Sequence, residues 1–115
     1  MSNITYASAR VNVRNLNVEV FERALQMLAQ KHKLTLRRVG EKRWELVDVF
    51  GRDVAVILHK DYVDVKGYYE YVDVVREELE RYYTAAAFEH VLQTLGFSVE
   101  VNPVGSAIEV VAVKV

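Results

Sequence analysis

The stretch that decides the fold occurs twice: residues 21–28 read Phe-Glu-Arg-Ala-Leu-Gln-Met-Leu, and residues 88–95 read Phe-Glu-His-Val-Leu-Gln-Thr-Leu. Phe, Glu, Leu, Gln and Leu recur at the same spacing in both copies. Apolar residues at this spacing are typical of an amphipathic helix. Because each copy is followed by an alternating stretch and a valine-rich run, we predict a duplicated helix–strand–strand unit. The two halves of the chain should then be related by a rough two-fold symmetry.

The alternating stretches around the two copies predict strands. A period of two, with apolar side chains on one face, is typical of a half-buried strand. This pattern occurs over residues 5–14, 34–39, 44–50, 62–66, 97–102 and 108–115. Residues 54–59 are instead apolar on both faces, which suits a central strand covered on two sides. Residues 68–73 fit either a further strand or a widened hairpin arm. Turn-forming residues place turns at 40–43, 51–53 and 102–106.

Capping residues predict the helix ends. Asn15 or Asn17 suits the N-cap of the first helix, which should reach about Lys31. The second helical region starts near Val74 and ends before Gly96, a good C-terminal cap. Since Thr84 could cap a separate helix, residues 74–95 fit either one bent helix or two short ones.

These elements predict an α+β fold in the order βαβββ(β)αββ. The connections are too short for crossovers, so antiparallel neighbours are expected, and two helices would pack on one face of a single sheet. No linker interrupts residues 1–115, which we interpret as one domain. The helix stripes expected to face the core are Phe21, Ala24, Leu25 and Leu28 in the first helix, and Val75, Leu79, Tyr82, Ala86, Phe88, Val91, Leu92 and Leu95 in the second region.

The composition is that of an ordinary globular chain. Hydrophobic residues make up 51% and charged residues 27% of the 115 residues, and the net charge is −1. There is no cysteine, which excludes disulfides, thiolate metal sites and cysteine nucleophiles. No signal peptide or membrane span is evident, so a cytoplasmic location is expected. Abundant valine with little Asn and Gln favours a thermophilic source.

Several short motifs resemble a family of short proteins of unknown function. They are Met1-Ser2-Asn3-Ile4-Thr5, Ala24-Leu25-x-x-Leu28, Asp53-Val54-Ala55-Val56-Ile57, Tyr62–Val65 followed by Tyr69–Asp73, and Arg81-Tyr82-Tyr83 leading to Leu95–Val99. The family occurs in cyanobacteria, in plastid genomes as a conserved hypothetical reading frame, and in phages. The order matches over nearly the whole chain, although this chain has longer material around Lys31–Arg43. The resemblance implies a fold and no chemistry, because the family has no established catalytic residues. An archaeal virus or mobile element would fit as the source.

One candidate function is nucleic-acid binding by the basic segment Lys31–Trp44. Cations can grip phosphates while an aromatic ring stacks on a base. In the alternative interpretation, the cations interact with the dipole at a helix C-terminus and lie on a solvated hairpin tip. The aromatic residue is then the first core residue of a strand. The slightly acidic net charge and the lack of a recognised binding motif favour that alternative. The residues concerned are Lys31, His32, Lys33, Arg37, Arg38, Lys42, Arg43 and Trp44.

A second candidate is a ligand-binding or catalytic site around His59–Asp73. Carboxylates and imidazoles in this region could bind a metal or move protons. The paired histidine spacing of known metal sites is missing, and the five glycines are scattered turn residues. We therefore predict no metal, no cofactor and no catalytic residue. The residues considered are His59, Asp61, Asp64, Asp73 and His90.

The favoured function is self-association. Residues 54–59 and 107–113 are apolar on both faces, while two helices can cover only one face of a sheet. The closing strand, with Ile108 and Val110, would invite strand pairing if it were a free edge. We predict a non-enzymatic binding or adaptor module that forms a homodimer through the open sheet face or that edge, and that also binds a protein partner. Tyrosines suit such interfaces, and the candidates are Tyr62, Tyr68 and Tyr69.

Overall fold

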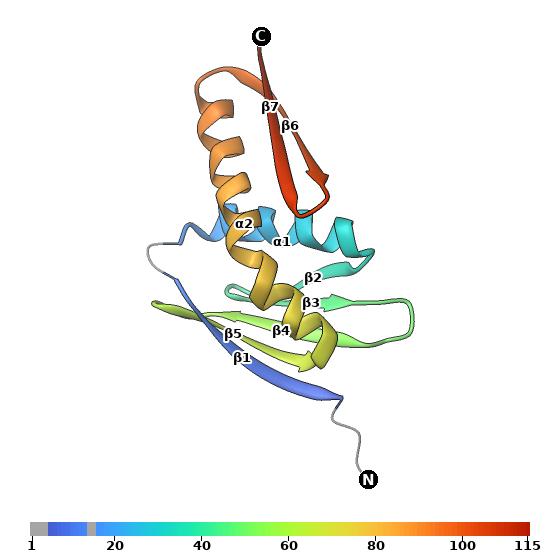
Figure 1. The fold of residues 1–115 in the computed structure, drawn as a ribbon. Helices are drawn as coiled ribbons and strands as arrows, with labels where there is room; N and C mark the ends of the chain where they lie inside the picture. The colour runs from blue at the N-terminus through green and yellow to red at the C-terminus, as the bar shows by residue number, and fades with distance from the viewer. Residues whose placement is uncertain (1–4, 14–15) are drawn as a thin grey trace.

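The computed structural model describes residues 5–13 and 16–115, so the expectations for Met1–Ile4, Arg14 and Asn15 lie outside the described residues. Within these ranges the chain forms two helices and seven strands (Figure 1). In chain order they are β1 (Tyr6–Asn12), α1 (Val18–His32), β2 (Thr35–Gly40), β3 (Arg43–Val47), β4 (Asp53–Leu58), β5 (Tyr62–Tyr68), α2 (Tyr69–Thr94), β6 (Phe97–Val104) and β7 (Ala107–Lys114).

The strands form two sheets. Five of them make an antiparallel sheet in the order β1-β5-β4-β3-β2, and β6 and β7 form a separate hairpin. The α+β class, the antiparallel pairing and the contact of the helices with the sheet are confirmed. The expected single sheet is instead divided in two. The reason is the length of α2: 26 residues extend about 39 Å, so the chain leaves the helix far from the edge of the first sheet.

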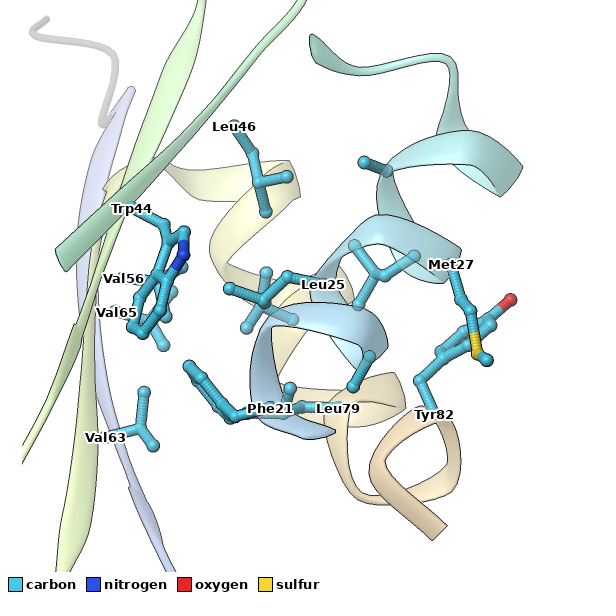
Figure 2. Packing of buried hydrophobic residues seen from close by; sticks show 14 of the residues in the cluster. Phe21, Leu25, Met27, Trp44, Leu46, Val56, Val63, Val65, Leu79 and Tyr82 are labelled. Carbon is cyan, nitrogen blue, oxygen red and sulfur yellow. The ribbon is translucent and has the colours of Figure 1, made fainter. Parts of the chain in front are cut away.

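The core lies between the five-stranded sheet and the two helices. Figure 2 shows Trp44, Val56, Val63 and Val65 of the sheet pointing toward Phe21 and Leu25 of α1. All six side chains are fully buried. Tyr82 of α2 lies beside Met27 on the side of α1 that faces away from the sheet (Figure 2).

The ends of α1 follow the expected capping chemistry. The Asn17 side chain accepts hydrogen bonds from the backbone N–H groups of Glu19, at 2.9 Å, and Val20, at 3.2 Å. This confirms Asn17 as the N-cap. The helix ends at His32, and Lys33 adopts a left-handed conformation with φ of 57°.

The second helix is longer and simpler than expected. It runs unbroken from Tyr69 to Thr94, so the start near Val74 and the strand over residues 68–73 are wrong. The Thr84 hydroxyl donates to the Glu80 carbonyl within the helix, at 3.0 Å, and caps nothing. Neither helix in the described ranges has an apolar stretch long enough to cross a bilayer.

Two turns differ from their predicted bounds. The C-terminal hairpin turns at Gly105 and Ser106 alone, and Asn102 and Pro103 belong to β6. Strand β3 ends at Val47, and residues 48–52 form a loop held by the Asp48 side chain.

Candidate functional site

Residues 81–115 form an arm that extends from the body of the molecule. The arm consists of the second part of α2 and the β6–β7 hairpin, at the top of Figure 1. It gives the molecule an elongated shape of 57 × 30 × 22 Å. A helix and a two-stranded hairpin can form only a very small core. Since an isolated hairpin is at best marginally stable in water, the arm depends on the packing of the hairpin against α2.

Helix α2 carries two apolar stripes, of which one is buried. The inner stripe packs against α1 and the sheet, and its members follow the alternating spacing of three and four expected for one helix face: Val72, Val75, Leu79, Tyr82 and Ala86. The predicted burial of Val75, Leu79, Tyr82 and Ala86 is therefore confirmed. The outer stripe, defined as Phe88, Val91, Leu92 and Leu95, faces solvent. Phe88, Val91 and Leu95 are 58%, 54% and 61% exposed, so their predicted place in the core is wrong.

The two copies of the repeated motif therefore present different faces. In the first copy Phe21 is fully buried, whereas in the second Glu89, the next residue after Phe88, is buried at 7% exposure. Glu89 continues the inner stripe one turn beyond Ala86. Arg23 of α1 donates to both of its carboxylate oxygens, at 2.8 and 3.0 Å. This paired hydrogen bond raises the pKa of Arg23 and holds α2 in the rotation that turns Phe88 outward.

A groove of about 620 Å³ runs beside the outer stripe. Its apolar wall comes from Phe88 and Leu92 of α2 and from Ile108 and Val110 of β7. Charged side chains lie at one end, where Glu77, Glu80 and Arg81 line the rim. Arg81 also donates to the Ser106 carbonyl oxygen at 2.7 Å, which ties the hairpin turn to the helix. The predicted interface residues Ile108 and Val110 are thus brought together with a helix stripe that was expected to be core.

The groove opens on the β7 side of the arm. On the other side, β6 residues Val101, Asn102 and Pro103 share a smaller hollow with Arg23 and Met27 of α1. The β6 side therefore faces the body of the molecule, and the β7 side faces solvent. On the hairpin face turned away from α2, Val111 and Val113 are exposed as well. This confirms that strand β7 is apolar on both faces.

The open face of the five-stranded sheet is less apolar than expected. Its outward β4 residues are Ala55 and Ile57, and charged residues lie opposite both of them on the neighbouring strands. Ala55 pairs with Glu45 and Lys66, and Ile57 pairs with Arg43 and Asp64. The apolar surface expected on this face is therefore interrupted by charged residues, and dimerisation through it stays a prediction.

The predicted basic segment is largely neutralised by acidic partners. Glu78 accepts hydrogen bonds from Lys31 at 3.1 Å and lies 2.9 Å from the His32 ring nitrogen. Arg37 pairs with Glu45 at 2.8 Å, and Arg38 pairs with Glu22 at 3.3 Å. The remaining cations, Lys33, Lys42 and Arg43, are exposed and have no ion-pair partner among the described residues. Nucleic-acid binding stays a prediction with fewer free charges to support it.

Trp44 cannot stack on a base. Its side chain is fully buried, with its ring edge-on to Phe21 at a centroid distance of 5.1 Å. The indole Nε1 donates to the Glu22 carboxylate at 3.3 Å. The alternative interpretation of Trp44, as a core residue at the start of a strand, is confirmed.

The structure does not gather the candidate residues around His59–Asp73 into one site. His59 lies 3.1 Å from Asp64 and stacks on the Tyr62 ring, with ring centroids 4.4 Å apart. Asp73 instead pairs with Arg76 on α2, at 3.1 Å. Over residues 5–13 and 16–115, no three His, Asp or Glu side chains are arranged to hold a metal ion. Asp61 is exposed in the turn between His59 and Tyr62, and His90 is exposed on α2.

An exposed loop tip at residues 48–52 is a feature that sequence patterns missed. Val49 and Phe50 are 88% and 79% exposed. Asp48 braces the loop, because its Oδ1 accepts from the backbone N–H groups of Phe50 and Arg52, at 2.8 and 2.9 Å. Its Oδ2 accepts from the Arg52 guanidinium and the Tyr71 hydroxyl. An aspartate followed by a glycine-containing loop is the signal that could have found it. Tyr68 and Tyr69, two of the predicted interface tyrosines, lie beside this loop with ring centroids 5.1 Å apart.

Asp48 should make the loop sensitive to acid. Burial opposes ionisation of this carboxyl, but the hydrogen bonds from Tyr71, Arg52 and Phe50 outweigh it and lower its pKa to about 2. A carboxyl with a pKa below its unfolded value, about 3.9, stabilises the fold above that value and loses the contribution as pH falls toward 2. We expect Asp48→Asn to lower the urea midpoint of unfolding at pH 7. The difference in midpoint between the variant and the unmodified protein should become smaller between pH 4 and pH 2. An equal difference in urea midpoint at every pH would contradict the lowered pKa of Asp48.

No family model matches the chain, and no curated protein or solved structure matches it. The resemblance to the cyanobacterial, plastid and phage family therefore stays a prediction. The function has to be inferred from the surfaces of the molecule itself.

Proposed function

We propose that this protein is a non-enzymatic binding module that self-associates through its arm. The observation that carries the proposal is the outer stripe. Phe88, Val91 and Leu95 are more than half exposed on a regular helix, beside a groove with apolar walls. A contiguous exposed apolar surface of this kind usually marks an interface.

A second copy of the chain is the simplest partner for this surface. Homodimers with two-fold symmetry are the commonest assemblies, and a self-complementary surface needs only one chain. Association would also support the arm, whose hairpin has a single helix to pack against. A further protein partner could then bind the body of the dimer, for which the loop tip with Val49 and Phe50 is a candidate surface.

The proposal predicts that Phe88 is needed for assembly. Burying a phenylalanine contributes about 1.5–3 kcal/mol, and a two-fold axis doubles the loss, so we expect Phe88→Ser to raise the dimer dissociation constant at least about tenfold. Light scattering coupled to gel filtration, over a micromolar concentration series, measures the change in mass.

Phe50→Ser is the matched control, because it removes an even more exposed phenylalanine away from the arm. It should leave the dimer intact. A monomeric mass for the unmodified protein at micromolar concentration would refute self-association. Equal dissociation by both variants would refute the placement of the interface on the arm.

A further inference from the structure

Strand β7 has an open edge that is not blocked by proline. Natural proteins block open edges with charged residues or proline. Edge strand β2 carries Arg37 and Arg38, and β6 carries Pro103. Strand β7 reads AIEVVAVK, which has no proline and carries charges only at Glu109 and Lys114. It is also the edge on the solvent side of the arm, next to the groove.

The hairpin register identifies which backbone groups of β7 are free. Gly105 and Ser106 form a two-residue turn between the paired residues Val104 and Ala107. In such a hairpin the residues flanking the turn exchange hydrogen bonds, and the pairing alternates from there along the strands. Pro103, opposite Ile108, fits this pattern, since proline has no N–H and is tolerated where that group would point outward. The residues whose N–H and C=O groups point away from β6 are therefore Ile108, Val110, Ala112 and Lys114.

We propose that two copies pair along β7 in antiparallel fashion, with Val111 facing its counterpart across the two-fold axis. This mode of pairing rests on the self-association proposed above, and it joins the two hairpins into one four-stranded sheet. Ile108 then faces Lys114 of the second copy, and Val110 faces Ala112. Every outward-pointing residue of β7 gains a hydrogen-bonding partner. A register centred on Val110 would place Lys114 opposite the turn residue Ser106, and one centred on Glu109 would place like charges together.

The same register covers the outer stripe. Each α2 lies over its own two strands, so the two helix axes would be separated by two strand spacings, about 9.6 Å. Helices pack at interaxial distances of about 8–10 Å. Since Phe88 and Leu92 line the groove on the β7 side, they would face the second helix across the axis. The dimer would then be a sheet of four strands covered by two antiparallel helices.

Charge complementarity also favours a second copy as the occupant. Side chains an even number of residues apart lie on the same face of a strand, so Lys114 shares the α2-facing side of β7 with Ile108 and Val110. On β6, Phe97 pairs with Lys114 and Pro103 pairs with Ile108. In the proposed register, Lys114 of the second copy lies beside Ile108. Ile108 lines the groove together with Glu77 and Glu80. Lys114 of each copy would therefore lie near the charged end of the other copy's groove, where the two carboxylates Glu77 and Glu80 outnumber the one cation, Arg81.

The absence of cysteine from the sequence permits a direct test by single-cysteine crosslinking. Directly opposed residues on antiparallel strands have Cβ atoms about 4.5–5.5 Å apart, close enough for a disulfide after a small adjustment. We expect Val111→Cys to form a covalent dimer with copper phenanthroline as the oxidant, at low micromolar protein. Val113→Cys lies on the same face of the same strand. Its counterpart would be offset by four residues, about 13 Å, so we expect crosslinking at least about tenfold slower.

The possible results distinguish pairing along β7 from self-association by another surface. If the unmodified protein is a dimer by light scattering and Val111→Cys crosslinks no faster than Val113→Cys, the β7 pairing is refuted while self-association stands. If the unmodified protein is a monomer, both are refuted. Faster crosslinking of Val111→Cys, suppressed when Phe88→Ser is added, supports the proposed dimer.

Discussion

Replacing Gly67 with alanine should destabilise the protein by about 3–5 kcal/mol, among the largest effects expected of any single substitution. Gly67 has φ of +147°, in a region that side-chain-bearing residues rarely adopt. A Cβ atom there would collide with the Asp53 carbonyl oxygen and lie 2.7 Å from the Cα atom of Val54. Both are backbone atoms of β4, so neither can rotate away. Urea unfolding measures the loss.

Gly51→Ala is the matched control for this substitution. Gly51 also has a positive φ, of +82°, but a Cβ atom added there meets nothing within 4 Å. It should cost about 1–2 kcal/mol, the price of the backbone conformation alone. Equal losses for the two variants would show that close approach of β4 is not what requires glycine at position 67.

The location of Gly67 connects this prediction to the arm. It pairs with Ala7 of β1 and Val54 of β4, and α2 begins two residues later. The close approach of β5 to β4 therefore lies directly before the start of α2. A variant that folds with a shifted β5 should also shift the arm.

Trp44→Ala should destabilise the protein by about 3–5 kcal/mol, as large aromatic-to-alanine changes in cores do. The substitution empties a fully buried site, removes the edge-on contact with Phe21, and leaves Glu22 without the indole donor. Trp44→Phe keeps most of the buried volume and should cost less than half as much. Guanidinium unfolding of the three proteins gives the comparison.

The Trp44 result also bears on the nucleic-acid alternative. If Trp44→Ala kept full stability, the residue would not be part of the core, and stacking on a base would again be open. If stability falls as expected, any nucleic-acid binding must depend on exposed cations such as Lys33, Lys42 and Arg43. Such binding would be purely electrostatic and steeply salt-dependent.

Local chemistry predicted most of the secondary structure. The asparagine cap at Asn17, the apolar run that predicts β4 and the inner stripe through Leu79 and Tyr82 each depend on neighbouring residues only, and each is confirmed. The errors lie where a local signal had more than one structural solution. Residues 68–73 alternate like a strand, yet Tyr69 onward is helical because Val72 and Val75 pack into the core as part of α2. Pro103 was assigned to a turn, but an edge strand accepts a proline at a position that needs no N–H.

The candidate site was predicted only in part. Ile108 and Val110 were predicted as interface residues because a valine-rich run without proline signals an unprotected strand, and the structure places both on the wall of the groove. Phe88 and Leu95 were missed as surface residues because apolar residues at helical spacing normally face a core. The braced loop at Asp48 was missed because its hydrogen bond to Tyr71 joins residues far apart in the sequence.

By itself, the sequence determined that two related amphipathic helices exist and which residues share a face on each. The spacing of Phe21, Leu25 and Leu28, repeated in Phe88, Leu92 and Leu95, is a property of the helix period. Only the tertiary structure decided which of those faces is covered. Phe21 is buried under the sheet, whereas the Arg23–Glu89 pair and the inner stripe turn Phe88 outward, into the groove beside β7. The reason is that the faces of a continuous helix are fixed relative to one another. Packing of one part of α2 against α1 therefore determines which side chains point outward along its whole length.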